Sequence, residues 1–193
     1  FVTPVGDKLC FVANDGAHGY ELWASDGTRM GTRMVADLAP GPASSAPINL
    51  AAVGERLFFS AWDERGRELW TSDGTVSGTL RVRDIYAGRE SSNPRHLTDV
   101  AGSLFFAARN IDTADEVWVS DGTEPGTHLV KDIRSGTASS SPASFTAVGG
   151  KLFFVAEDDQ SGLELWVSDG TEAGTHLVKD IRGGSSSSFP RHL

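Results

Sequence analysis

Short apolar segments alternate along the whole chain with clusters of Gly, Ser, Asp and Pro, and none of these segments is long enough for a typical helix. In the last quarter of the chain, four such segments carry β-branched, aromatic and alternating apolar residues, a pattern typical of strands. Because the turns between them are short, we predict that the four segments form one up-and-down antiparallel sheet. They cover residues 144–148, 151–156, 163–168 and 175–181.

The same arrangement recurs four times along the chain. Its most constant part reads ELWASDGT at 21–28, ELWTSDGT at 68–75, EVWVSDGT at 116–123 and ELWVSDGT at 164–171. Its tryptophans are therefore 47, 48 and 48 residues apart. Periods of 40 to 50 residues are typical of β-propellers and of some helical solenoids, and the strand pattern inside each repeat favours the propeller.

We therefore predict an all-β fold, a β-propeller built from four four-stranded antiparallel blades of about 48 residues each. The predicted organisation is a single repeat domain over 1–193, with repeats at about 1–47, 48–94, 95–142 and 143–190, and with residues 191–193 completing the first strand. A closed four-bladed ring is favoured. The open alternatives are half of a ring that two chains share and a piece of a longer array.

In each copy, the segments that correspond to ELWVSDGT, GTHLVKDI, SSSP and VGGKLFF resemble the bacterial ELWxxDGT repeat family, and the resemblance covers essentially the whole chain. The resemblance implies a module that occurs in tandem arrays in large bacterial proteins, often secreted, with a β-propeller-like architecture and no established catalytic residue. It thus implies an extracellular or cell-surface location. The third copy departs from the pattern, since EVW replaces ELW at 116–118 and its loop DTAD at 112–115 lacks a glycine.

Charge and cysteine content narrow the function classes. The net charge of -9 and the pI near 4.9 argue against nucleic acid as a partner, because binding to phosphates needs clustered Lys and Arg. No apolar segment approaches the roughly 20 residues that span a bilayer, so membrane insertion is not expected. Cys10 is the single cysteine, and we expect it to be a buried apolar residue rather than a reactive thiol.

The recurrent turn has a structural interpretation. Its aspartates can accept backbone N–H bonds inside the turn, and the following glycines can adopt a positive φ. Calcium is the competing interpretation, but this ion prefers six to eight oxygen ligands and the turn offers one carboxylate. We therefore expect no cofactor and no metal site. The residues concerned are Asp26, Asp73, Asp121 and Asp169, followed by Gly27, Gly74, Gly122 and Gly170.

Two further sets of equivalent residues are expected to serve the fold. Four aspartates, each 14 residues after its tryptophan, are expected to bind backbone groups at strand ends, and the four tryptophans are expected to fill the space between blades. The alternative role for the tryptophans is carbohydrate stacking. The sets are Asp37, Asp84, Asp132 and Asp180, and Trp23, Trp70, Trp118 and Trp166.

The loop between the second and third strands varies in sequence and length. It reads NDGAHGY, WDERGR, RNIDTAD and EDDQSGL in the four copies. In a meander this loop lies at the same end of the blade as the connector that leaves the fourth strand, and binding residues concentrate on such loops. The candidate ligand-binding residues at this variable-loop end are Trp62, Asp63, Asp15, Arg109 and Asp158.

Each candidate also has a structural alternative. Trp62 could pack against a neighbouring loop, and Asp15, Asp63 and Asp158, together with Asn110, could simply cap their own turns. The chain contains no HExxH, GxSxG, CxxC or phosphate-loop motif, so no catalytic residue is predicted and the chain is not expected to be an enzyme.

The sequence therefore favours a non-catalytic binding or scaffold module of a bacterial extracellular or cell-surface protein. Its expected partner is an unidentified protein or glycan, and the chain would be a monomer or a dimer that completes a ring. A carbohydrate-binding lectin is the first alternative, although only one variable loop carries a tryptophan. A hydrolase or lyase that uses acidic residues at the variable-loop end is the second, although no paired carboxylates suggest one.

Overall fold

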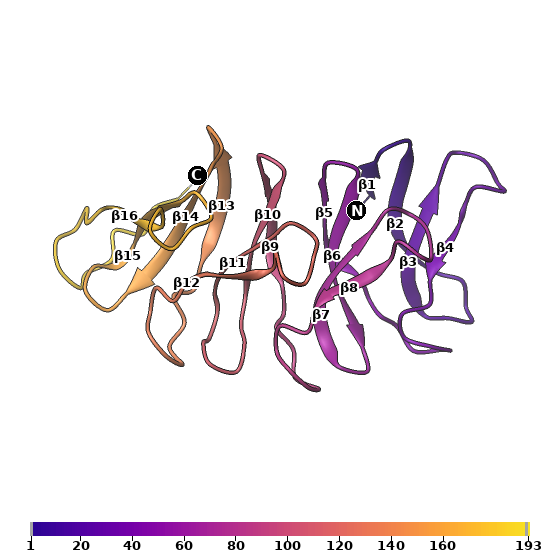
Figure 1. Cartoon of the computed structure of the whole chain (residues 1–193), viewed down its shortest axis with the longest axis horizontal. Coiled ribbons are helices and arrows are strands. Elements are labelled where there is room, and N and C mark those ends of the chain that lie inside the picture. Colours follow the sequence, from indigo (N-terminus) through magenta and orange to yellow (C-terminus); the bar gives the residue numbers. More distant parts are fainter. Residues whose placement is uncertain (1, 192) are drawn as a thin grey trace. The chain divides into compact units, whose positions relative to one another are not determined.

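All regular elements of the computed structural model, which describes residues 2–191 and 193, are β-strands. Sixteen strands form four separate sheets, and in each sheet consecutive strands are hydrogen-bonded neighbours in an antiparallel meander (Figure 1). The described residues contain no helix that could span a membrane. The predicted all-β, propeller-like fold with four repeated four-stranded blades is confirmed.

Each sheet, here called a blade, takes its strands from one repeat. Blade 1 contains β1 (Val2–Val5), β2 (Lys8–Asn14), β3 (Tyr20–Ser25) and β4 (Arg33–Ala36). Blade 2 contains β5 (Ile48–Val53), β6 (Arg56–Asp63), β7 (Gly66–Ser72) and β8 (Leu80–Arg83). Blade 3 contains β9 (Arg95–Val100), β10 (Ser103–Ala108), β11 (Glu116–Ser120) and β12 (His128–Lys131). Blade 4 contains β13 (Ala143–Val148), β14 (Lys151–Asp158), β15 (Gly162–Ser168) and β16 (His176–Lys179).

The outermost strand of blade 4 is shorter than its sequence pattern indicates. We predicted a strand over 175–181, whereas β16 ends at Lys179. The N–H of Ile181 points to the carboxylate of Glu164 at 3.4 Å and the N–H of Gly184 donates to Asp180 at 2.8 Å. These side-chain acceptors replace a strand partner, so the alternation of apolar residues continues beyond the strand.

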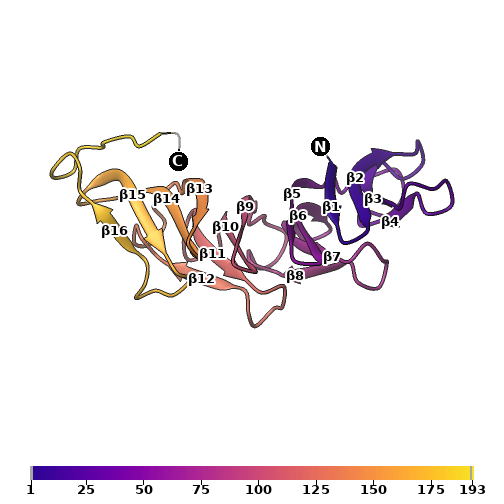
Figure 2. The same ribbon diagram turned by 90° about the horizontal axis from the view of Figure 1, so that it is seen from above.

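The chain divides within β9 into two compact units, Phe1–Leu97 and Thr98–Leu193. Unit 1 contains blades 1 and 2, and unit 2 contains blade 4 and all of blade 3 except the start of β9. In unit 1, one face of blade 1 packs on blade 2, and the two sheets lie side by side in Figure 2. Cys10 is fully buried in this interface, as predicted. In unit 2, blade 3 packs on blade 4 in the same way. Trp70 and Trp166 lie in these two cores, which confirms that these tryptophans fill space between blades.

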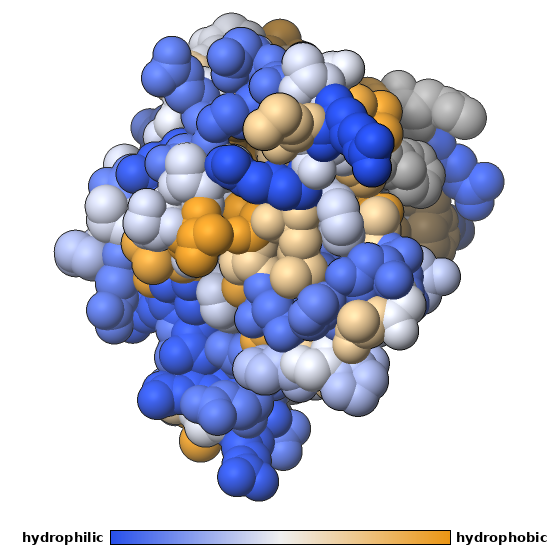
Figure 3. All heavy atoms as spheres, turned by 90° about the vertical axis from the view of Figure 1, so that its right-hand side faces the viewer, coloured by the Kyte–Doolittle hydropathy of each residue, from blue (hydrophilic) through white to orange (hydrophobic). Residues whose placement is uncertain are grey.

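Blades 1 and 4 each retain a partly exposed apolar face. On blade 1 this face contains Leu9, which is 39% exposed, whereas the equivalent Leu57 of blade 2 is fully buried. Figure 3 looks onto the side of unit 1 where blade 1 lies and shows apolar side chains gathered among polar ones. On blade 4, Val178 is 45% exposed, whereas the equivalent Val130 is 4% exposed. We call these surfaces the free faces of blades 1 and 4; they also include the half-buried Phe11, Trp23 and Met34 on blade 1 and Phe153 and Leu165 on blade 4.

Candidate functional site

The recurrent turn is a closed network of hydrogen bonds. In blade 1, Asp26 Oδ1 accepts the backbone N–H of Thr28 at 2.9 Å and its hydroxyl at 2.8 Å. The hydroxyl oxygen of Thr28 accepts the N–H of Gly31 at 2.9 Å, and the hydroxyl of Thr32 donates to the Thr28 carbonyl at 2.7 Å. Ser25 completes the network through its 2.7 Å contact with the Thr32 hydroxyl. The bonds from Thr28 hold the pKa of Asp26 below its usual range.

The same network recurs in the other three blades, and Asp73, Asp121 and Asp169 each accept the N–H and hydroxyl of the threonine two residues later. The glycines after the four aspartates have φ between 79° and 92°. Both predicted features of the turn are therefore confirmed. Among residues 2–191 and 193, no group of three His, Cys, Asp or Glu side chains is placed to hold a metal ion.

A buried glutamate ties each blade to the connector that follows it. In blade 2, the carboxylate of Glu68 accepts the N–H of Ser92 at 3.0 Å, the hydroxyl of Ser92 at 2.6 Å and the N–H of Ile85 at 3.0 Å. The other blades repeat the glutamate–serine pair at the same separation of 24 residues. The four glutamates are fully buried. The remaining pairs are Glu21–Ser45, Glu116–Ser140 and Glu164–Ser188.

Burial raises the pKa of Glu68 and Glu116 to about 7, although the hydrogen bonds from Ser92 and Ser140 act in the opposite direction. A raised carboxyl pKa is common in catalytic acids. Here, however, the carboxyl is inaccessible to solvent and is present in each blade, so its role is to hold the blade and its connector together. Sequence analysis did not identify these glutamates, and the constant spacing of 24 residues between the recurrent glutamate and a serine of the connector was the available signal.

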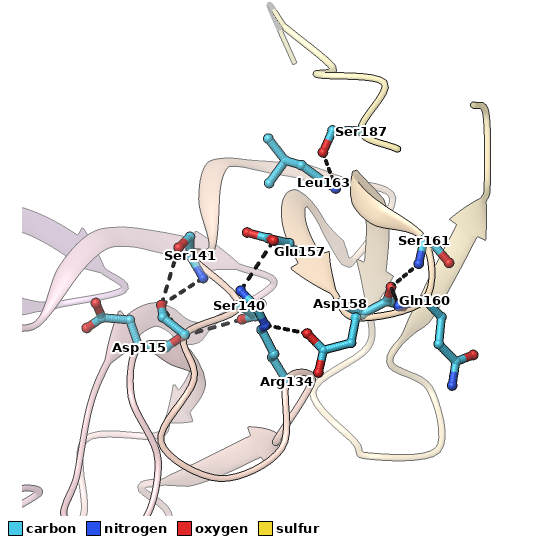
Figure 4. Close-up of polar contacts among 12 residues, drawn as sticks. Asp115, Arg134, Ser140, Ser141, Glu157, Asp158, Gln160, Ser161, Leu163 and Ser187 are labelled. Atoms are coloured by element: carbon cyan, nitrogen blue, oxygen red, sulfur yellow. Dashed lines mark hydrogen bonds and ion pairs between the residues drawn. The ribbon is translucent and has the colours of Figure 1, made fainter. Parts of the chain in front are cut away.

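At the variable-loop end, the predicted acidic residues cap their own turns. Asp158 Oδ1 accepts the N–H of Gln160 at 3.0 Å and that of Ser161 at 2.5 Å (Figure 4). Equivalent bonds run from Ala17 to Asp15, from Arg65 to Asp63 and from Asp112 to Asn110, at 2.9, 2.8 and 2.9 Å. The turn-capping alternative is thus confirmed for Asp15, Asp63, Asn110 and Asp158.

Asp15 is further fixed by its own loop. Its Oδ2 lies 2.7 Å from His18 Nδ1. The backbone N–H of Ala17, followed by the contacts with His18, lowers the pKa of Asp15 to about 2, and the carboxylate raises the pKa of His18. Asp15 therefore has little capacity left to act as an acid or a base near neutral pH.

Trp62 is the tryptophan of the variable loops, and one side of its indole packs on Arg67. Its residue is 41% exposed, and the guanidinium carbon of Arg67 lies 5.2 Å from its ring centroid. Arg67 is buried and donates to the carbonyls of Ser60 and Ala46 at 3.0 and 3.1 Å. Burial lowers the pKa of Arg67. The backbone N–H of Trp62 bonds to the Ser45 carbonyl at 2.8 Å, so this residue is tied to the neighbouring connector through its main chain while its side chain packs on Arg67.

The rest of this loop in blade 2 is also charged. Arg81 pairs with Asp63 at 2.9 Å, and Arg65 pairs with Asp84 at 3.3 Å. A cleft of about 370 Å³ lies beside them and includes Arg89 in its lining. Asp84 thus binds a side chain, whereas its equivalents accept the backbone N–H of the glycine four residues later, as predicted. These equivalents are Asp37, Asp132 and Asp180.

The five predicted binding residues are divided between the two units. Trp62 and Asp63 are adjacent on β6, and Asp15 lies on the equivalent loop of blade 1. Arg109 and Asp158 belong to unit 2. Beside Asp158, Arg134 forms ion pairs with Glu157 at 3.3 Å and with Asp159 at 2.7 Å.

A cleft of about 640 Å³ in unit 1 lies between β1 and β5. Its lining is apolar except for Thr3 and Asn49, and it contains no acid or base. The apolar lining residues are Val2, Val12, Pro47, Ile48 and Leu50.

Comparisons with known proteins support the fold only. No family model matches the chain, and no curated protein shows a significant match. Among solved structures, puromycin hydrolase aligns with 96% of this chain at a TM-score of 0.61 and 17% identity, and a mutant of it complexed with PGG aligns with 95% at the same score and identity. The acylaminoacyl peptidase of Pyrococcus horikoshii aligns with 95% of this chain at a TM-score of 0.58 and 13% identity. The chain spans 29%, 29% and 27% of these proteins, so the likeness concerns one part of each.

Proposed function

We propose that the chain is a non-catalytic β-propeller module of a bacterial extracellular or cell-surface protein that binds a protein or glycan through its variable-loop end. The observation that carries the proposal is the pair formed by Trp62 and Arg67, which are cross-strand partners in blade 2. The same positions hold Asn14 and Tyr20 in blade 1 and a glutamate and a leucine in blade 4. Repeat architecture therefore does not require the pair, in contrast to the recurrent turn.

The geometry of this pair suits binding. A guanidinium over an indole contributes about 0.5 to 2 kcal/mol, depending on how far it is desolvated. Because Arg67 restrains the ring in the free protein, a ligand that packs on the exposed part of Trp62 loses little side-chain entropy. Aromatic anchors surrounded by polar groups are common binding centres, and Asp63, Asp15, Arg109 and Asp158 would form the polar surroundings.

The hydrogen bonds of the acidic side chains in the variable loops support the non-catalytic part of the proposal. Their carboxylates accept N–H bonds within their own turns, and the raised carboxyl pKa values belong to glutamates that solvent does not reach. The bacterial and extracellular setting rests on the resemblance to the ELWxxDGT repeats.

We also propose that the four blades close into a ring in which the free faces of blades 1 and 4 cover each other. Within both units, the face of one blade that contains Cys10 or Phe105 packs on the face of the next blade that contains Trp70 or Trp166. The free face of blade 4 is equivalent to the faces that contain Cys10 and Phe105. The free face of blade 1 is equivalent to the faces that contain Trp70 and Trp166. Covering these two faces would stabilise the ring by about 25 cal/mol for each Å² of apolar surface that is removed from water.

The binding proposal is tested with Trp62→Ala and a matched variant, Met30→Ala, at a residue that is 94% exposed on the opposite end of blade 1. A glycan and peptide screen, with and without calcium, first supplies a ligand. Trp62→Ala should weaken its binding by about tenfold or more, while the free energy of unfolding stays within about 1 kcal/mol of the parent. Met30→Ala should bind normally. If Trp62→Ala binds unchanged while variants of Asp26 or Asp121 lose the ligand, the binding end has been assigned backwards.

A further inference from the structure

A groove of about 420 Å³ in unit 2 lies at the recurrent-turn end, between blade 3 and the turn of blade 4. Its apolar lining includes Phe105 and Val119, and its polar lining includes Asp121, His128 and Asp169. The variable-loop end carries none of these residues, so this groove is separate from the surface around Trp62.

The equivalent place in unit 1 is occupied by a lysine of the chain itself. The stem of Lys8 lies over Gly74, the glycine of the blade 2 turn, such that a Cβ on Gly74 would lie 3.1 Å from Lys8 Cδ and 3.5 Å from Lys8 Nζ. The charge of Lys8 contributes to the lowered pKa of Asp73, after the hydrogen bonds from Thr75. An alkyl chain over the glycine and an ammonium beside the aspartate therefore already exist once in this fold.

Unit 2 keeps the apolar part of this arrangement and lacks the ammonium. Ser103 stands at the position of Lys8, and Phe105 stands at the position of Cys10. Phe105 now lies over the turn glycine, since a Cβ on Gly170 would be 3.2 Å from its Cζ. The short side chain of Ser103 leaves the groove above it open.

The turn aspartates of unit 2 also have less positive charge around them than those of unit 1. In unit 1, the positive charge of Arg33 contributes to the lowered pKa of Asp26, and that of Lys8 contributes to the lowered pKa of Asp73. In unit 2, Asp121 has His128 in place of the arginine. In the surroundings of Asp169, the positive charge comes from Lys151, which lies on the same blade as Asp169 and outside the groove lining. The groove of unit 2 therefore has more negative charge than its counterpart in unit 1.

We propose that this groove binds a primary alkyl-ammonium group, in the form of an exposed lysine side chain of a partner protein. The methylene stem would lie along Phe105 and Val119, in the way that lysine stems cover apolar surface while the charged end stays polar. The ammonium would lie between the carboxylates of Asp121 and Asp169. Binding at a single site of this kind is expected to be weak and to decrease with salt.

The test uses Nα-acetyl-lysine methylamide as the probe and the uncharged Nα-acetyl-norleucine methylamide as its control. Backbone amide shifts of the whole chain are followed by NMR during titration. The lysine probe should shift the amides of Ser103, Asp121 and Gly170, and the norleucine probe should not. Equal shifts with both probes, or no shift at these amides with the lysine probe, would overturn the proposal.

Two reciprocal variants sharpen the test. Ser103→Lys supplies the ammonium from within the chain, so it should weaken binding of the lysine probe at Gly170 by about tenfold. Lys8→Ser opens the equivalent place in unit 1, so it should add probe-dependent shifts at Gly74 and Asp73. Undiminished binding to a folded Ser103→Lys would contradict the proposal. If that variant does not fold, absence of new shifts in Lys8→Ser would contradict it instead.

Discussion

The two glycines of each recurrent turn are required for different reasons. Gly170 has a φ of 92°, a conformation that side chains with a Cβ rarely adopt. Gly174, four residues later, has no such φ, but a Cβ there would overlap with the carboxylate of Asp169. The first requirement follows from the sequence pattern, whereas the second depends on how the aspartate folds back over the turn.

Replacing Gly170 with Val should lower the free energy of unfolding by roughly 1 to 3 kcal/mol through the enforced positive φ. Gly122→Val should behave similarly, since its φ is 89°. Urea unfolding measures the loss, with Glu172→Ala, at an exposed position of the same turn, as the control. A loss no larger than that of Glu172→Ala would refute the structural account of the turn.

The turn should also be insensitive to chelators. The aspartate oxygens bind the threonine two residues later, so removing divalent ions should change the melting temperature little. A large decrease on adding chelator, reversed by calcium, would instead show that a bound ion stabilises the folded state.

At the residue scale, the sequence identifies residues that differ between repeats more readily than it identifies which side chains contact each other. Trp62 stood out because its equivalents are Asn14, Arg109 and Glu157, and the structure places it partly exposed. Its contact with Arg67 could not be predicted, because the register of β6 against β7 decides which side chains meet. The contact between Glu68 and Ser92 could not be predicted either, because it depends on how the connector folds back onto the third strand.

At the scale of elements, the buried glutamates join the third strand of each blade to the connector that follows the blade. From the sequence alone, this Ser-rich connector resembles a flexible spacer. Leu163 donates its N–H to Ser187 at 3.0 Å, and Ser188 donates its own to Glu164 at 2.9 Å (Figure 4 shows the first contact). The serines of the connectors are thus acceptors and donors at fixed positions. The four strands predicted for blade 4 agree with the structure to within one or two residues. At the end of β16, the N–H of Ile181 points to the carboxylate of Glu164 instead of a strand partner.

These glutamates predict a specific pH dependence. Since burial raises the pKa of Glu68 and Glu116 from 4.5 to about 7, the folded state binds more protons than the unfolded state between these values. Their contribution to stability is therefore fully present below about pH 4.5 and is lost as the pH rises towards 7. Each group changes the free energy of unfolding by at most about 1.4 kcal/mol per pH unit.

The measurement is urea unfolding of the parent and of a Glu68→Gln, Glu116→Gln double variant across this pH range. The double variant should be less stable at low pH, because each amide offers one acceptor where the carboxyl offers two oxygens, but its stability should decrease less steeply with pH. Glu124→Gln, at an exposed turn, should keep the slope of the parent. Identical slopes for the parent and the double variant would show that the buried carboxyls do not titrate in this range.

At the scale of the whole molecule, the repeat predicts how many blades form but not what covers the outer faces of the first and last blades. A blade is stable only when both faces are covered, and the pattern of strands such as LFFSA at 57–61 shows that each blade is built for two neighbours. The residues of a terminal blade look the same whether its outer face meets another part of the chain, a second copy or further repeats. The exposure of Leu9 and Val178 locates the two faces that require a partner.

The central claim, closure of the four blades within one chain, is tested most directly by a distance between spin labels on equivalent turns, in a Cys10→Ala background. Labels at Arg29 and Val76 report the separation of blades 1 and 2, which are neighbours in unit 1, and labels at Arg29 and Glu172 report the separation of blades 1 and 4. A closed four-bladed ring predicts that the second distance equals the first and is unchanged when labelled chains are diluted with unlabelled ones. A clearly longer distance, or a short one that disappears on dilution, would contradict closure within one chain.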